Sequence, residues 1–272
     1  MKLILDTSAC SRIATSPHRK KLEEHLDSRF RRVVSVPTFW ELLDKIDGGD
    51  GSHFAADKEV IKVAAGRTRS PMMLPNPLSY AVETVLKLPR PSRPIPPRVF
   101  KQAYELVMKA RTRKELYEGV PVLRGLKQVR QFDPTVVRQQ QDEGEQAHIE
   151  RLKWAKRTKM EFLPPNEWAR AVVKQLGVTL DDPQAAELAD RLDAAYQFDV
   201  EVWKVVTAPD SSYNAEKHGN DWLDMQQTLY LCDPAIHVVT ADKPLCKKIS
   251  ASHQANRVHY LPDYLAQNGL SL

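Results

Sequence analysis

Cysteine is scarce in this chain, and its placement excludes two common uses. The three cysteines, Cys10, Cys232 and Cys246, form no CxxC pair and show no zinc-ligand spacing. A disulfide framework and a structural zinc site are therefore not indicated. We expect free thiols in a reducing cytosol.

Long apolar runs and several common catalytic motifs are also missing. No stretch approaches the roughly 18 consecutive apolar residues of a membrane span, and the first residues lack the basic-then-apolar pattern of a signal peptide. We therefore expect a cytoplasmic protein that does not contact a membrane. The chain contains no Gly-rich phosphate loop, no HExxH motif, no Ser-His-Asp order and no repeat of fixed period.

The composition is that of a folded protein with a mildly basic surface. The chain has 272 residues, of which 42% are hydrophobic, enough to build a core and to exclude a disordered chain. The formal charge is +5 and the calculated pI is about 9.0. This balance favours a polyanionic partner over an acidic one.

Apolar strand patterns occur near both ends of the chain and alternate there with helical patterns. The four expected strands are residues 3–5, 31–36, 235–240 and 257–260. Alternating strands and helices predict an α/β domain with a parallel sheet. We expect this domain to comprise residues 1–52 and 215–272, and residues 53–214 to form a mainly helical insertion. Within the insertion, the proline-rich residues 89–98 predict an extended connector.

Acidic residues stand at comparable positions in four segments of the predicted α/β domain. Asp6 ends the first strand, Glu41 lies early in the helix after the second strand, and Asp242 closes the third. Asp221 and Asp224 share one face at the start of another helix. Taken singly, each acid also fits a turn, a helix cap or a first helical turn. Taken together, they lie at the edge of the sheet where ligands bind in open α/β folds.

Four converging carboxylates would repel one another. Two like charges about 4 Å apart cost roughly 4 kcal/mol at an effective dielectric constant of 20. Such a cluster raises its own pKa values or binds a cation. Oxygen ligands favour Mg²⁺ or Mn²⁺, which activate water and stabilise the leaving oxygen in phosphodiester hydrolysis.

These motifs, in this order, resemble the PIN domain family. The resemblance rests on Asp6-Thr7-Ser8, on Glu41 after a hydrophobic strand, on Asn220-Asp221 followed by Asp224 at a helix start, and on Thr240-Ala241-Asp242-Lys243. It covers about residues 1–50 and 215–265, and the large insertion departs from a compact member. The resemblance implies a Rossmann-like α/β/α fold and Mg²⁺- or Mn²⁺-dependent endonuclease activity, usually on RNA. It also leaves open a cognate antitoxin or inhibitor protein, because many PIN proteins are toxins.

The resemblance assigns roles to seven residues of this chain. Asp6, Glu41, Asp224 and Asp242 match the catalytic and metal-binding acids, and Asp221 matches an additional acid of some members. Thr7 and Thr240 match hydroxyls that orient the first and last carboxylates.

A basic segment in the insertion is a candidate nucleic-acid surface. Residues 151–159 contain five basic residues, one tryptophan and no acid, a combination that suits a phosphate backbone and a stacked base: Arg151, Lys153, Trp154, Lys156, Arg157 and Lys159. A solvated helix face with Trp154 packed inward explains the same pattern. His218, just before the acidic helix, is either a substrate contact or a plain loop residue.

The sequence therefore favours a metal-dependent ribonuclease. The alternative is a catalytically silent PIN-like module that binds RNA or protein, although such a module has no need for four repelling acids. A haloacid-dehalogenase-type phosphatase would need a second Asp two residues after Asp6, where Ser8 stands.

Overall fold

The computed structural model describes residues 1–48, 53–66, 72–88, 104–118 and 134–272. Its centre is a single five-stranded sheet in the order β3-β2-β1-β4-β5, with every pairing parallel. The strands are β1 (Lys2–Leu5), β2 (Arg31–Val34), β3 (Met72–Met73), β4 (Ile236–Thr240) and β5 (Val258–Tyr260). The fold is thus α/β with a parallel sheet, as predicted.

One face of the sheet is covered mainly by the N-terminal helices. They are α1 (Thr7–Thr15), α2 (Arg19–Arg29), α3 (Val36–Gly48) and α4 (Phe54–Ala65), joined by α14 (Leu261–Gln267). Side chains alternate across the pleat, so Leu3 and Leu5 of β1 enter this core while Ile4 enters the opposite one. A helix at residues 104–109 and α7 (Arg113–Glu118) follow α4 and α5 in the chain.

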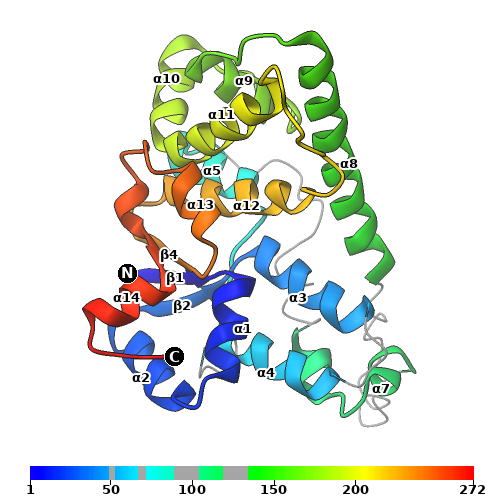
Figure 1. The fold of residues 1–272 in the computed structure, drawn as a ribbon, viewed down its shortest axis with the longest axis vertical. Coiled ribbons are helices and arrows are strands. Elements are labelled where there is room, and N and C mark those ends of the chain that lie inside the picture. The colour runs from blue at the N-terminus through cyan, green and yellow to red at the C-terminus, as the bar shows by residue number, and fades with distance from the viewer. Residues whose placement is uncertain (49–52, 67–71, 89–103, 119–133) are drawn as a thin grey trace.

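The opposite face is covered by a thick helical layer (Figure 1). Nearest the sheet lie α5 (Pro77–Leu86), α12 (Asn220–Thr228), the short 3₁₀ turn η2 (Leu229–Cys232) and α13 (Lys243–Lys248). Above them stand α9 (Pro165–Lys174), α10 (Asp182–Arg191) and α11 (Asp193–Thr207), with the long α8 (Pro134–Thr158) along one side. None of the described helices is both long enough and apolar enough to cross a bilayer.

The helical layer shares one continuous core with the sheet. Ile4 and Val238 of the central strands belong to the same buried cluster as Trp168 of α9 and Phe198 of α11. The range 53–214, expected as an insertion, also contains sheet-domain parts, because β3 pairs with β2 and α4 packs on α1. The sequence did not predict β3, because a strand of two residues is too short to show an alternating pattern. The expected connector 89–98 lies outside the described residues.

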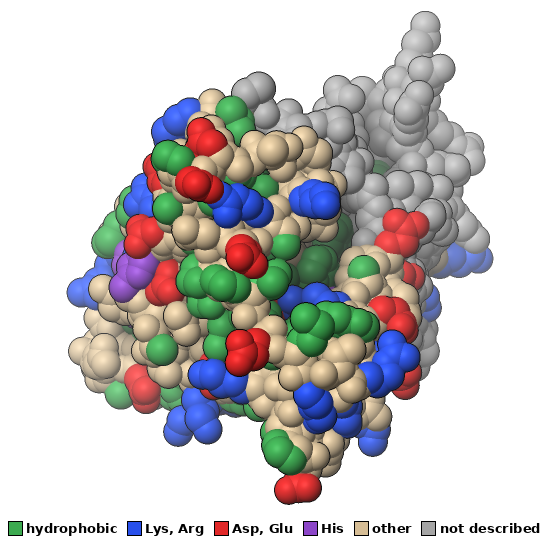
Figure 2. All heavy atoms as spheres, turned by 90° about the horizontal axis from the view of Figure 1, so that it is seen from above, with side chains coloured by type: hydrophobic (Ala, Val, Ile, Leu, Met, Phe, Trp, Pro, Cys, Tyr) green, Lys and Arg blue, Asp and Glu red, His purple; other side chains and the backbone are tan. Residues whose placement is uncertain are grey.

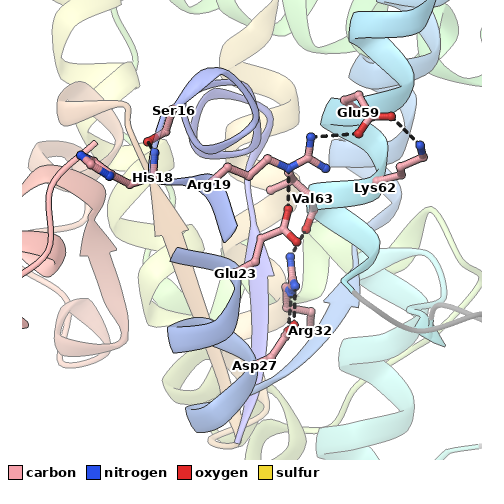
Figure 3. A network of polar contacts seen from close by, with 9 residues as sticks. All are labelled: Ser16, His18, Arg19, Glu23, Asp27, Arg32, Glu59, Lys62 and Val63. Carbon is pink, nitrogen blue, oxygen red and sulfur yellow. Dashed lines mark hydrogen bonds and ion pairs between the residues drawn. The ribbon is translucent and has the colours of Figure 1, made fainter. Parts of the chain in front are cut away.

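A network of ion pairs fixes the side of the sheet domain that carries α2 and α4. Arg32, only 3% exposed, donates to both carboxylate oxygens of Asp27 at 2.7 Å and to the Val63 carbonyl at 2.6 Å (Figure 3). Arg19 donates to Glu23 at 2.7 Å and to Glu59 at 2.9 Å. Every acid in this network therefore faces a cation.

Candidate active site

The parallel topology brings four acidic side chains to one edge of the sheet. Asp6 directly follows β1, Asp242 lies two residues past β4, and Glu41 lies in the second turn of α3, after β2. Asp224 comes from α12, which packs against α3. We call these four residues the acidic cluster.

Asp6 is held by donors from both ends of the chain. One oxygen accepts the Ala9 N–H at 2.7 Å and caps α1. Ser8 Oγ reaches both oxygens at 2.9 Å, and Thr240 Oγ1 of β4 donates to Oδ2. Asp6 is thus the N-cap of α1, and it is also tied to the neighbouring strand.

Hydroxyl groups also contact Glu41 and the backbone of Asp242. Thr7 Oγ1 donates to Glu41 Oε2. Thr240 Oγ1 accepts the Asp242 N–H at 2.8 Å, so one hydroxyl links Asp6 to Asp242. Thr240 thus contacts both the first acid and the last, whereas the hydroxyl of Thr7, which the resemblance assigned to the first carboxylate, donates to Glu41 instead.

Buried polar contacts set the position of α3 relative to its neighbours. Thr38 Oγ1 donates to the Leu5 carbonyl at 3.2 Å, which joins α3 to the end of β1. Ser35 Oγ donates to Gln227 Oε1 at 2.6 Å, which joins the end of β2 to α12. These bonds fix the helices that carry Glu41 and Asp224.

The charges of the acidic cluster are only partly compensated by nearby cations. Burial raises the pKa of Asp224 well above its ordinary value, and the charges of Glu41 and Asp242 raise it further. Burial likewise raises the pKa values of Asp6, Glu41 and Asp242, and neighbouring acids add to each shift. Lys248 offsets part of this effect at Asp224 and Asp242. Clustered carboxyls with shifted pKa values are typical of functional sites.

The donor set suits Mg²⁺ or Mn²⁺, because all four side chains offer carboxylate oxygens. Across the described part of the chain, however, no three His, Cys, Asp or Glu side chains are gathered into a ready-made metal site. The chemistry of the side chains fits a divalent cation.

Asp221 lies beside the acidic cluster, where its charge raises the pKa of Asp242, but its own carboxylate is paired. One of its oxygens pairs with Lys248, and the other accepts a hydrogen bond from Tyr213 Oη at 2.6 Å. The residue is 7% exposed and both oxygens are engaged. In this structure Asp221 anchors Lys248 and Tyr213 beside the cluster.

A cavity of about 990 Å³ opens from the acidic cluster. Asp224 and Asp242 line its acidic end, and Lys248 of α13 lies beside them. The rest of the wall is formed by α11 and the segment of residues 208–220, which we call the wall loop.

Most cations of the basic segment 151–159 contact other parts of the molecule, although Lys156, Arg157 and Lys159 are exposed. Arg151 pairs with the buried Asp199, and Lys153 pairs with Glu216 at 2.9 Å. Lys156 Nζ donates to the Tyr213 carbonyl at 2.9 Å, and Lys159 Nζ donates to the Ala208 carbonyl at 3.0 Å. Three of these lysines thus hold the wall loop. Figure 2, the view from above, shows basic and acidic side chains interspersed on this end of the molecule.

The remaining two residues of the predicted nucleic-acid surface are exposed. Arg157 lies in the last turn of α8, and Trp154 is 41% exposed with its ring 6.2 Å from that of Trp203. Trp154 is therefore neither fully packed inward nor free of neighbouring rings.

The structure also identifies site residues that sequence reasoning missed. Ser8 donates to Asp6 and accepts the Ala241 N–H at 2.9 Å, which joins the ends of β1 and β4. Its position two residues after Asp6 was a usable signal. Lys248 and Tyr213 contact Asp221 from separate segments, and no local sequence pattern predicts these contacts.

Comparison of the chain with protein-family models, with curated proteins and with solved structures found no match.

Proposed function

We propose that this protein is a metal-dependent endoribonuclease that hydrolyses phosphodiester bonds at the acidic cluster. The observation that supports this proposal most directly is the electrostatics of the cluster. Four segments bring carboxylates to this edge of the sheet, and hydroxyl groups orient those of Asp6 and Glu41. Burial and like charges raise the pKa values of these acids. A divalent cation would relieve that repulsion.

Asp6, Asp224 and Asp242 are the residues that would hold Mg²⁺ or Mn²⁺. When bound, such an ion supplies an activated water and neutralises charge on the phosphate. Glu41, oriented by Thr7, would complete the site or orient the attacking water. Ser8 and Thr240 keep the carboxylate of Asp6 in place. The preference for RNA rests on the resemblance to PIN domains.

The test is cleavage of end-labelled RNA and single-stranded DNA by the purified protein with Mg²⁺, Mn²⁺ or EDTA. Asp6→Asn and Asp224→Asn keep the shape of each side chain and remove its charge. We expect metal-dependent cutting by the wild type and none by either variant. Glu187→Gln, an exposed acid on α10, is the matched control and should cut normally.

Two results would contradict the proposal. The first is equal cutting by wild type and both folded variants, which would point to a contaminating nuclease. The second is binding of RNA without cleavage under any metal condition, which would favour the silent binding module.

A further inference from the structure

The wall loop carries a pair of stacked rings in the cavity that opens from the acidic cluster. The rings of Tyr213 and His218 have centroids 4.6 Å apart and an interplanar angle of 18°. Both residues line the cavity together with Asp224 and Asp242. A flat aromatic surface thus lies in the same cavity as the acids that would cleave a phosphodiester.

The orientation of this ring pair is fixed from two sides. Tyr213 Oη donates to Asp221, which is itself paired with Lys248. The Tyr213 carbonyl accepts a hydrogen bond from Lys156 of α8. His218, by contrast, is exposed. Tyr213 is therefore the anchored ring, and His218 is the ring that an incoming base can cover.

The cavity provides space and positive charge for the rest of a nucleotide. Its volume, about 990 Å³, lies at the upper end of the roughly 300–1,000 Å³ range of small-molecule sites. Lys217 and Lys204 also line it, both exposed, and Lys204 pairs with Glu201 at 2.6 Å. For Lys217, no ion pair occurs within the described part of the chain. Aromatic surfaces beside lysines are the features that hold single-stranded nucleic acids.

We infer that His218, backed by Tyr213, stacks on an unpaired base next to the phosphodiester that the acidic cluster cleaves. This inference rests on the proposed function for its account of the cluster, and it adds a subsite and a preference for single strands. A paired base cannot cover His218, because its faces are already stacked within the duplex.

The test is the binding of fluorescein-labelled single-stranded RNA, measured by fluorescence anisotropy in EDTA so that nothing is cut. We expect His218→Ala to weaken binding about 10-fold, as for the loss of one stacked base. His218→Tyr retains an aromatic ring and should restore most of the affinity. His18→Ala removes an exposed histidine that does not line the cavity, and it should have no effect.

Abasic RNA tests the contact directly. A single abasic position, moved along the RNA, should weaken wild-type binding at one place by about the same factor. At that place His218→Ala should show no further loss, because the two changes remove the same contact. A duplex of the same sequence should bind more weakly than the single strand.

Three results would overturn the inference: unchanged binding by His218→Ala, fully additive losses for the variant and the abasic RNA, or equal affinity for duplex and single strand. A complete lack of RNA binding would also overturn it. The binding assay involves neither metal nor cleavage. A protein that stacks on RNA through His218 but never cuts it would therefore refute the nuclease proposal and leave the stacking inference intact. A protein that cuts normally with His218→Ala would refute only the stacking.

Discussion

Two buried acids of this protein have pKa values shifted in opposite directions. Asp199 of α11 is 2% exposed, and its carboxylate accepts hydrogen bonds from Arg151 and from Trp168 Nε1. Burial alone would raise its pKa, but these donors outweigh burial and leave the pKa below its ordinary value. Asp224 is also largely buried, yet its neighbours are acids and its pKa is raised.

This contrast separates a structural charge from a functional one. A buried ion that serves only the fold needs a partner, since an isolated buried charge is costly. The helical layer supplies that partner for Asp199, and β2 and α2 supply one for each other through Arg32 and Asp27. The acids of the acidic cluster are compensated only in part, by Lys248 and Lys45. This weaker charge compensation is what we expect of a site that binds an external cation.

The largest effect should follow from breaking the compensated pair. Asp199→Ala leaves the Arg151 guanidinium without its partner, and we expect the free energy of unfolding to fall by about 3–5 kcal/mol. Urea unfolding followed by circular dichroism measures this. Asp182→Ala is the matched control, because it breaks an exposed pair with Arg170 and should cost less than about 1 kcal/mol. Equal losses of unfolding free energy in the two variants would show that the buried pair stabilises the fold no more than the exposed one.

The pH dependence of His148, a neighbour of that pair, sharpens the comparison. Burial, together with the adjacent Arg151, lowers its pKa from 6.5 to about 4. Between these values the unfolded chain binds a proton that the folded protein does not, so stability is full above about pH 6.5 and declines as the pH falls toward 4. The loss should reach up to about 3 kcal/mol.

His148→Phe separates this titration from that of other groups. Phenylalanine keeps a ring beside Trp222, which lies 5.8 Å away, but binds no proton. Urea unfolding at several pH values should show a weaker decline below pH 6.5 than in the wild type. His18→Phe, at an exposed site, should leave the decline unchanged. Parallel curves for wild type and His148→Phe would contradict the assignment.

At the acidic cluster, the hydroxyl that links two acids should affect chemistry more than folding. Thr240→Val removes the donor to Asp6 and the acceptor for the Asp242 N–H. We expect cleavage to fall about 10- to 100-fold, as for residues that orient metal ligands.

Thr228→Val provides the matched control for Thr240→Val. Thr228 is also buried, and its hydroxyl only donates to the Met225 carbonyl within α12. Both changes should cost about 1–3 kcal/mol of stability, but only Thr240→Val should slow cleavage in a single-turnover assay. Equal rates would show that the Thr240 hydroxyl serves the fold alone.

The sequence predicted the central features of the fold because they depend on short-range patterns. Apolar runs before Asp6 and Asp242 identified β1 and β4, and parallel strands necessarily bring their carboxyl ends to one edge. The apolar patterns predict separate helices at about 183–195 and 197–206, but the structure places the break earlier, at Leu192, where no glycine or proline marks it. Local patterns therefore located the strands that carry the site but missed boundaries set by packing.

The partners of charged residues were harder to predict than their positions. Residues 151–159 look like a nucleic-acid surface in sequence, but Asp199 lies 48 positions from Arg151. The carbonyls bound by Lys156 and Lys159 are also distant in the chain. Tertiary packing alone brings these groups together, so Arg151 and the three lysines also hold α11 and the wall loop.

The smallest expected change in stability is that of Asp224→Asn. It tests most directly whether Asp224 differs from Asp199. Removing one charge from a partly compensated cluster should raise the free energy of unfolding by about 1 kcal/mol at neutral pH without metal, by relief of like-charge repulsion. The raised pKa of Asp224 sets the sign, because an acid that binds protons more tightly when folded loses stability as the pH rises from its unfolded pKa to its folded one. The advantage of the variant should therefore vanish in acid. Excess Mg²⁺ should reverse it at neutral pH, since only the intact cluster would gain from the ion. A variant less stable than the wild type at every pH, with no response of either protein to Mg²⁺, would place Asp224 with Asp199 as a structural acid.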